Sequence, residues 1–176
     1  MRISAGRWKG RRLGVPLNAR PTSSRAREAL FDILGPRIEG ARVLDLFAGS
    51  GAVGFEAVSR GAAGAVLVDP DAEALRQARA ALGADDEVLV LASEAANAVA
   101  DLGRRGERFD VVFADPPYRD GERAVRDLSG IALLLSPGGV LVVQTDAEQE
   151  PPSLEGFAPV SSRAYGRNVF HFLRIL

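Results

Sequence analysis

The apolar positions of this chain first follow a helical period and then change to an alternation of strands and helices. Between residues 22 and 34 the apolar side chains recur at i, i+3, i+4, i+7 and i+8: Ala26, Ala29, Leu30, Ile33 and Leu34. That spacing puts them on one face of an amphipathic helix. Ser23 or Ser24 can cap the helix, and Gly35-Pro36 ends it.

From residue 41 onward, short apolar runs alternate with helical segments. Strands are predicted at 41–47, 65–69, 87–91, 109–115 and 140–145, and helices after the first strand to about residue 60 and at 71–82, 94–102 and 122–135. Parallel strands need crossover connections, so the alternation predicts an α/β domain whose largely parallel sheet is covered on both faces.

The two ends of the chain depart from this alternation. Residues 158–165 and 168–176 flank Gly166-Arg167 with no helix between them, which predicts a hairpin that joins the sheet antiparallel. Residues 2–4 and 11–15 have a β-like pattern. We therefore expect a small N-terminal extension at 1–21 and a main domain at 22–176.

The composition fits one folded domain and removes several kinds of chemistry. The 176 residues are 47% hydrophobic, enough for a substantial core. Without cysteine, the chain has no disulfides, cysteine-rich zinc site or cysteine nucleophile, and we expect no metal site. The one histidine, His171, alternates with apolar neighbours and is interpreted as structural. No stretch suits a membrane span or signal peptide, so we expect a cytoplasmic protein.

Positive charge is concentrated at the N-terminus. Residues 1–27 contain eight basic residues and no acid, although the whole chain has a net charge of −1. The eight are Arg2, Arg7, Lys9, Arg11, Arg12, Arg20, Arg25 and Arg27. A basic arm on an acidic body indicates a polyanionic partner, and a solvated basic tail is the alternative.

The first predicted strand leads into DLFAGSGAVG, in which Gly49, Gly51 and Gly54 satisfy G-x-G-x-x-G. Asp69 follows 20 residues after Gly49, at the end of the second strand, where a carboxylate can accept hydrogen bonds from a ribose. The glycines alone could serve only a tight turn. With Asp45 before them and Asp69 after them, the pattern favours nucleotide binding.

Asp45 favours S-adenosylmethionine (SAM) over NAD as the ligand. It lies four residues before the first glycine, where a carboxylate suits a ligand that carries a cation and opposes a pyrophosphate. SAM has an ammonium and a sulfonium and no phosphate. The chain is also too short for the further domain that a dehydrogenase needs. Glu94 follows the third strand and could reach the adenine amino group, and a solvated first-turn acid is the alternative.

The fourth predicted strand, FDVVFAD, continues into Pro116, Pro117 and Tyr118. Proline has no N–H, so two prolines make a stiff elbow with free carbonyl acceptors, to which Asp115 adds another. A site made of acceptors suits an exocyclic amine. Tyr118 can stack on the base, which is worth about 1–3 kcal/mol, and the held nitrogen would attack the SAM methyl group in line. The alternative is a plain Pro-Pro turn after a core strand.

Together, DLFAGSGAVG and ADPPY resemble class I SAM-dependent methyltransferases that modify amino groups of adenine, cytosine or guanine. The segment ARPTSSRAREALFDIL (19–34) resembles the R-P-T-x-x-x-x-R-E-x-L-F segment of bacterial 16S ribosomal RNA guanine-N2 methyltransferases, which act on guanine 966. MRISAGRWKGRRL and YGRNVF (165–170) resemble that family's opening and its last hairpin. The resemblance therefore spans almost the whole chain.

This resemblance implies a Rossmann-like class I methyltransferase fold with a seven-stranded sheet, SAM as cofactor, and 16S RNA or the small ribosomal subunit as the partner of a monomer. The cofactor site would comprise Asp45, Phe47, Ala48, Gly49, Ser50, Gly51, Asp69, Glu94 and Ala95. Asp115, Pro116, Pro117 and Tyr118 would hold a flipped-out guanine. The residues expected over the cofactor or against RNA are Arg7, Trp8, Lys9, Arg11, Arg12, Arg20, Thr22, Arg25 and Arg27. For Trp8, which could stack on a base, covering the edge of the core is an equal alternative. Asp69 stands where the family pattern has Glu, and Glu94 where it has Asp.

Three other functions fit parts of the pattern. An adenine-N6 methyltransferase of DNA or RNA would share the glycine turn and DPPY, although the chain has no insertion large enough for a DNA target-recognition domain. A non-catalytic RNA-binding or assembly module would be free to lose Asp45 and DPPY. A small NAD-binding protein fits least. Methylation at C5 of a pyrimidine is disfavoured because it needs a cysteine nucleophile.

Overall fold

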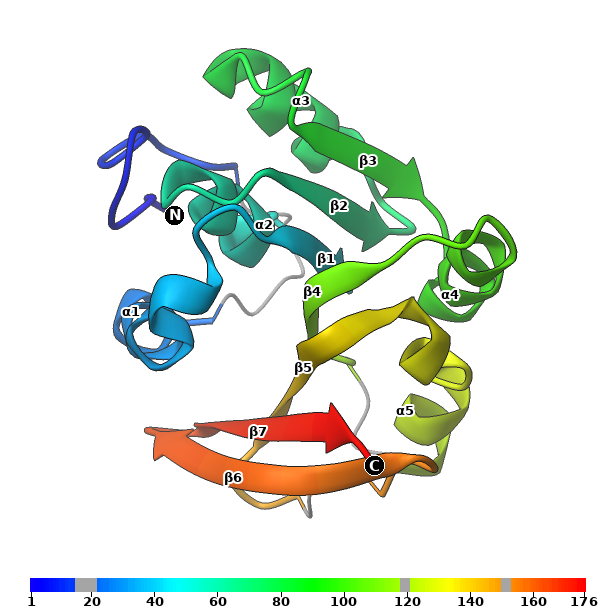
Figure 1. Ribbon diagram of the computed structural model, residues 1–176. Helices are drawn as coiled ribbons and strands as arrows, with labels where there is room; N and C mark the ends of the chain where they lie inside the picture. The colour runs from blue at the N-terminus through cyan, green and yellow to red at the C-terminus, as the bar shows by residue number, and fades with distance from the viewer. Residues whose placement is uncertain (15–21, 118–120, 150–152) are drawn as a thin grey trace.

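The computed structural model describes residues 1–14, 22–117, 121–149 and 153–176, and its centre is one seven-stranded sheet (Figure 1). The strand order is β3-β2-β1-β4-β5-β7-β6. The strands are β1 (Arg42–Leu46), β2 (Gly64–Asp69), β3 (Val88–Ala92), β4 (Phe109–Ala114), β5 (Leu135–Asp146), β6 (Phe157–Tyr165) and β7 (Asn168–Ile175). The first five pair in parallel and the last two antiparallel, which confirms the predicted parallel sheet with its C-terminal hairpin.

Helices cover both faces of this sheet, as the alternation predicts. On one face, α1 (Ser24–Leu34), α2 (Ala52–Ser59) and α3 (Glu73–Leu82) pack on inward side chains such as Val43, Leu67 and Phe113. On the other face, α4 (Ala95–Arg104), α5 (Gly121–Asp127) and the short 3-10 helix η2 (Ile131–Leu134) cover residues such as Leu44 and Val112. The central strands β2, β4 and β5 alternate their side chains between the two cores.

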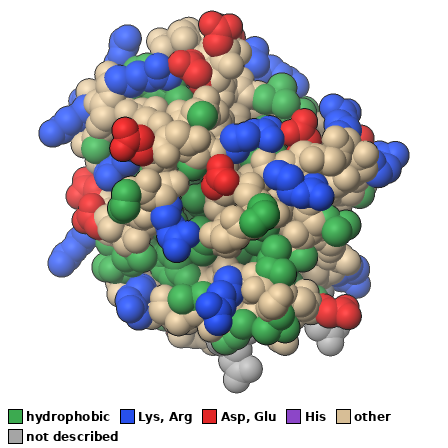
Figure 2. Space-filling model, viewed as in Figure 1, with side chains coloured by type: hydrophobic (Ala, Val, Ile, Leu, Met, Phe, Trp, Pro, Cys, Tyr) green, Lys and Arg blue, Asp and Glu red, His purple; other side chains and the backbone are tan. Residues whose placement is uncertain are grey.

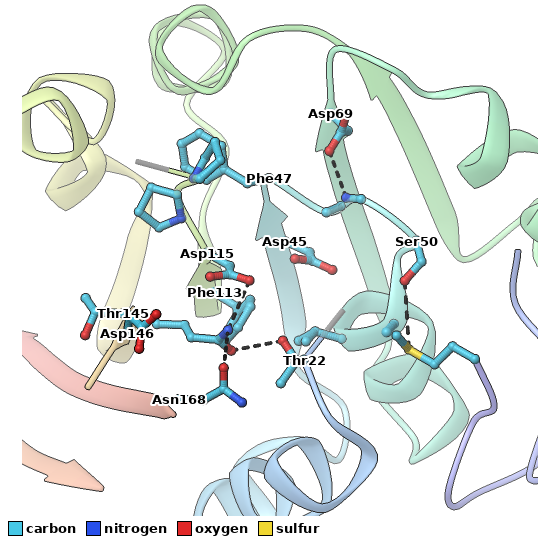
Figure 3. A pocket seen from close by; sticks show the side chains of 18 of the residues that line it. Thr22, Asp45, Phe47, Ser50, Asp69, Phe113, Asp115, Thr145, Asp146 and Asn168 are labelled. Atoms are coloured by element: carbon cyan, nitrogen blue, oxygen red, sulfur yellow. Dashed lines mark hydrogen bonds between the residues drawn. The ribbon is translucent and has the colours of Figure 1, made fainter. Parts of the chain in front are cut away.

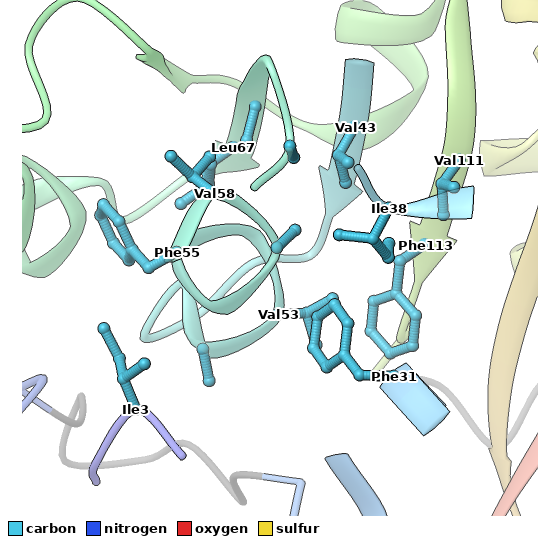
Figure 4. Close-up of a cluster of buried hydrophobic side chains, with 14 of the residues drawn as sticks. Ile3, Phe31, Ile38, Val43, Val53, Phe55, Val58, Leu67, Val111 and Phe113 are labelled. Carbon is cyan, nitrogen blue, oxygen red and sulfur yellow. The ribbon is translucent and has the colours of Figure 1, made fainter. Parts of the chain in front are cut away.

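Helix α2 lies at the centre of the first core, and all eight of its residues are buried (Figure 4). Phe55 and Val58 lie toward Leu67 of β2, while Val53 lies beside Phe31 of α1. Gly54 lets the helix approach the sheet closely, since a Cβ there would lie 2.7 Å from Leu67. This packing fixes the N-terminal end of α2 directly beside the end of β1.

The boundaries predicted from residue 22 to 115 and from 158 onward agree with the structure to within two residues, and two predictions between them differ from it. Ser23 is the N-cap of α1, and its hydroxyl accepts a hydrogen bond from the N–H of Ala26 at 3.2 Å. The helix predicted at 122–135 is wrong as a single element, because it divides into α5 and η2. Gly130 between them has φ = 83°, a left-handed conformation that a continuous helix cannot contain. Strand β5 begins at Leu135, earlier than predicted.

The N-terminal segment 1–14 packs against α2 instead of extending into solvent. Ile3, Trp8 and Leu13 are buried in the first core. The N–H groups of Arg7 and Trp8 donate to the carbonyl and hydroxyl oxygens of Ser59, both at 2.9 Å. The β-like pattern forms only an isolated antiparallel bridge between Arg2 and Arg12 among these described residues, and Val15 lies outside them. In the described parts of the chain, no helix is long and apolar enough to cross a bilayer.

Candidate functional site

A cleft of about 890 Å³ opens at the carboxyl ends of the parallel strands (Figure 3). Residues from β1, β2, β4 and β5 line it, together with the loop after β1 and the segment before α1. In open α/β sheets, ligands bind at this edge because the strand ends leave a crevice there. The cleft brings together Asp45, Asp69 and Asp115, which are far apart in the sequence.

The loop from Phe47 to Gly51 forms one wall of the cleft. Phe47, Gly49 and Gly51 have φ angles of 60°, 54° and 72°, so the chain turns sharply before α2 begins. The Ala48 N–H donates to the carbonyl of Val68 at 3.0 Å, and the Gly51 N–H donates to the carbonyl of Ala48 at 2.7 Å. A side chain at Gly49 would meet nothing within 4 Å, so this part of the loop faces open space.

Asp45 is a buried carboxylate that ties β1 to α2. It is 2% exposed, and its Oδ2 accepts a hydrogen bond from the N–H of Gly54 at 2.9 Å. A Cβ at Gly54 would lie 2.7 Å from Leu67 and 3.2 Å from that oxygen, so only glycine allows this approach. Burial raises the pKa of Asp45 to about 7, with Asp115 and Asp69 adding like charge and the Gly54 bond opposing them.

Asp69 holds the other side of the same loop. One carboxylate oxygen accepts from the N–H of Gly49 at 2.8 Å, and the other accepts from the N–H of Asp71 at 3.0 Å. A carboxylate oxygen has two lone pairs, so both can still accept from ribose hydroxyls. Glu94 lies between β3 and α4 and lines the cleft, whereas the next residue, Ala95, is buried against the second core.

The segment that follows β4 lies opposite the glycine loop. Asp115, Pro116 and Pro117 all line the cleft. Burial raises the pKa of Asp115 to about 7. The N–H of Asp115 donates to the carbonyl of Leu46 at 3.4 Å, which joins this turn to the end of β1. Tyr118, the fourth residue of the motif, lies outside the described residues.

A buried amide, which the motifs do not include, joins this segment to three other elements. Gln144 of β5 donates through Nε2 to Asp115 Oδ2 at 3.1 Å and to Asn168 Oδ1 at 3.3 Å. Its Oε1 accepts from the hydroxyl of Thr22 at 3.0 Å. Figure 3 shows these bonds converging between Thr22, Asp115 and Asn168. A lone glutamine in the apolar run VLVVQT is the only sequence signal of this role.

The cleft is strongly acidic. Of its described lining residues, Asp45, Asp69, Glu94, Asp115 and Asp146 are acids and Arg167 is the one basic residue. Arg167 pairs with Asp146 at 3.4 Å. The N-terminal turn of α2, where a pyrophosphate would bind, is already bonded to Asp45. The lining therefore fits the cationic SAM and opposes a dinucleotide, as Asp45 alone predicts.

The residues of the predicted RNA surface differ in their exposure to solvent. Arg7, Lys9, Arg11, Arg12 and Arg25 are exposed, and Arg7 pairs with Glu87 at 2.9 Å. Thr22 is buried and lines the cleft, and Arg20 lies outside the described residues. On the face in Figure 2, Lys and Arg side chains are interspersed with Asp and Glu.

Two of the predicted RNA contacts are corrected by the structure. Arg27 is completely buried, and its guanidinium bonds to Glu56 and to the carbonyl of Arg2, both at 2.6 Å. Trp8 is 8% exposed and packs in the first core, beneath the guanidinium of Arg7 at 4.2 Å. Side chains so enclosed cannot reach RNA, so both are structural residues that hold the N-terminal segment against α2.

The strand order, the glycine loop after β1 and the antiparallel C-terminal strands define the class I methyltransferase fold. The chain is similar in structure to the protein yhhF from Escherichia coli, with a TM-score of 0.82 and 34% identity over 99% of this chain and 97% of that one. Residues 1–174 match the family described as Conserved hypothetical protein 95, and the chain belongs to that family.

Several relatives carry a functional name, including two proteins of the same name from different bacteria. Ribosomal RNA small subunit methyltransferase D of Escherichia coli strain K12 is 44% identical over 126 residues, which are 69% of this chain and 62% of that protein. The match thus spans less than two thirds of that relative. The protein of the same name from Haemophilus influenzae is 33% identical over 94% of this chain and 89% of that protein.

Proposed function

We propose that this protein is a SAM-dependent methyltransferase that modifies the exocyclic N2 of a guanine in 16S ribosomal RNA, at guanine 966. The observation that carries the proposal is one cleft in which the acidic wall of Asp45 and Asp69 faces Asp115 and its two prolines. The names of the two relatives support ribosomal RNA over DNA as the substrate, and methylation over a purely structural role.

The cofactor would lie against the loop from Phe47 to Gly51. SAM supplies a methyl group on a positively charged sulfur. Asp69 would hold its ribose, and Glu94 lies on the same side of the cleft for the adenine. Asp45 contributes negative charge beside the cationic end, in a buried position where electrostatic attraction is strong.

The guanine amine would bind at Asp115. A carboxylate oxygen and the proline carbonyls accept hydrogen bonds, and an exocyclic amine donates two. Holding the amine this way points its lone pair along the line of attack. As the nitrogen–carbon bond forms and the carbon–sulfur bond breaks, the nitrogen loses a proton. Asp115 is placed to hold that proton, because burial brings its pKa to about 7.

The exposed basic residues of segment 1–14 and Arg25 would bind RNA phosphates outside the cleft. The target base must leave its stack to reach Asp115, which costs a few kcal/mol unless it is unpaired. Such a substrate places the enzyme in the bacterial cytoplasm, and we propose that it acts there as a monomer.

The test is one reaction with isotope-labelled SAM. Unmodified small ribosomal subunits and unmethylated DNA are incubated in parallel, and the labelled nucleoside is identified by mass spectrometry. We expect N2-methylguanosine from the RNA alone. Asp115→Ala should lower turnover by about 100-fold or more while SAM still binds, because the amine loses its acceptor. Exposed Asp85→Ala is the control. Labelled DNA, or near-normal turnover by Asp115→Ala, would contradict the proposal.

A further inference from the structure

Gln144 has an amide whose orientation is fixed by its partners. It is 6% exposed, and both ends of the amide are hydrogen-bonded. Turning the amide over would place Oε1 against two oxygen acceptors, Asp115 Oδ2 and Asn168 Oδ1. Because Oε1 carries no proton, the Thr22 hydroxyl must donate to it. In this arrangement, which suits an ionised Asp115, the side chain presents its N–H to Asp115.

We propose that Gln144 and Thr22 are positioning residues for Asp115, acting as a hydrogen-bonded chain that links the start of α1 to the carboxylate that receives the guanine amine. This inference rests on the proposed function. Thr22 lies two residues before α1, Gln144 lies on β5, and Asp115 follows β4, so the hydrogen-bonded chain joins three separate parts of the fold. Within the described residues it leaves Asp115 Oδ1 to accept from the substrate.

The hydrogen bond from Gln144 should also affect the ionisation of Asp115, whose pKa burial raises to about 7. A donor favours the ionised carboxylate, whereas burial disfavours it. The other charged groups that line the cleft are Asp45 on β1, Asp69 on β2, Glu94 before α4, and Asp146 on β5 with its partner Arg167. Four of these five are acids, so they also oppose ionisation. We expect the Gln144 N–H, which donates to Asp115 Oδ2, to oppose these effects and favour the ionised carboxylate.

The first test is Gln144→Met, which keeps the length of the side chain and removes its polar atoms. The titration of Asp115 is followed by ¹³C NMR of the carboxyl carbon in the free protein and assigned with Asp115→Asn. A hydrogen bond to a charged group is worth enough to move the midpoint upward by about one pH unit or more. We expect the pH profile of kcat to move the same way, with the KM for SAM within about 3-fold.

Thr22 supplies a second test that leaves Gln144 in place. Thr22→Val removes the hydroxyl at constant shape, so the amide loses the partner that fixes it. We expect a smaller shift in the same direction. Thr22→Ser restores the donor and should restore the wild-type titration. Ser59→Ala is the control, since it removes the hydroxyl that donates to the carbonyl of Ala5 at 2.6 Å, at the C-terminal end of α2 and outside the cleft lining.

The outcomes separate the two proposals. An unshifted titration in Gln144→Met and Thr22→Val, or equal shifts in Thr22→Val and Thr22→Ser, overturns the positioning role. If Gln144→Met does not fold, as its melting curve would reveal, the Thr22 pair carries the test. If the wild-type protein methylates no guanine while the titration shifts as expected, the proposed function fails and the hydrogen-bonded chain stands.

Discussion

The carboxylate of Asp45 and the N–H of Gly54 lie 2.9 Å apart, across the glycine loop that separates β1 from α2. This bond satisfies an otherwise unpaired donor in the first turn of the helix, where negative charge is favoured. Burial acts in the opposite direction and raises the pKa of Asp45 to about 7. The site is therefore poised between its neutral and charged forms when no ligand is bound.

SAM affinity should depend on pH through Asp45. The ionised carboxylate attracts the cationic ligand and the protonated one does not, so affinity should rise as pH increases through about 7 and level off above it. Asp45→Asn keeps an oxygen for Gly54 and removes the charge. We expect weaker binding with little of this pH dependence, measured by isothermal titration calorimetry at several pH values. A mutant with the wild-type pH dependence would show that Asp45 is not the group involved.

The stability of the free protein should also depend on the ionisation of Asp45. Here the protonated form is favoured, whereas SAM binding favours the ionised form. Because the folded pKa of Asp45 lies above its unfolded value of 3.8, its contribution to stability is fully present below that value and lost as pH rises through about 7. The melting temperature of Asp45→Asn minus that of the wild type should therefore increase by about 3 °C or more when the pH rises from about 5.5 to about 8.5. An equal difference at both pH values would contradict the raised pKa.

The ion pair of Arg27 and Glu56 should matter for folding and not for RNA binding. Both side chains are fully buried, and Ser4 and Arg60 also bond to Glu56. Burial raises the pKa of Glu56, but the hydrogen bonds from Ser4 and Arg27 outweigh it and leave the pKa below its ordinary value. Arg27→Met leaves this charge without its main partner, which should cost about 3–5 kcal/mol in urea denaturation.

Arg25 is the matched control for this prediction, because it lies in the same helix and is exposed. Arg25→Ala should leave the urea midpoint almost unchanged and weaken RNA binding. If Arg27→Met unfolds at the wild-type urea concentration, the pair does not stabilise the N-terminal segment as inferred here.

Much of the fold could be predicted because local patterns and burial agree. Strands such as 65–69 are continuous apolar runs, and Ser23 caps α1 by a rule that depends only on nearby residues. The prediction of one helix at 122–135 was wrong because Gly130 takes a left-handed conformation, which the spacing of apolar residues does not indicate. The acids at the strand ends were predictable, since parallel strands bring their carboxyl ends to one edge.

What the sequence could not provide is the side-chain environment. Arg27 and Arg25 look alike in a basic arm, and only tertiary packing buries one against Glu56, 29 residues away. Gln144 lies in no motif, and Asn168 lies in the YGRNVF segment, where the sequence alone assigns it no contact. Their role depends on β5 pairing with β7 beside Asp115. Trp8 could equally stack on a base or cover a core, and the fold places it in the core.

RNA binding should depend on the exposed residues Lys9, Arg11 and Arg12. Each phosphate contact releases condensed counterions, so removing three contacts should lower the slope of log affinity against log salt by about 2–3. We expect the triple alanine variant to bind small-subunit RNA more weakly at low salt and to melt at the wild-type temperature.

The control replaces Arg104, Arg105 and Arg108, which are exposed and lie near the start of β4, at the opposite edge of the sheet from the cleft. A filter-binding series in salt measures both variants. If the two triple variants lose the same slope, the N-terminal segment attracts RNA only through overall charge and is not the binding surface.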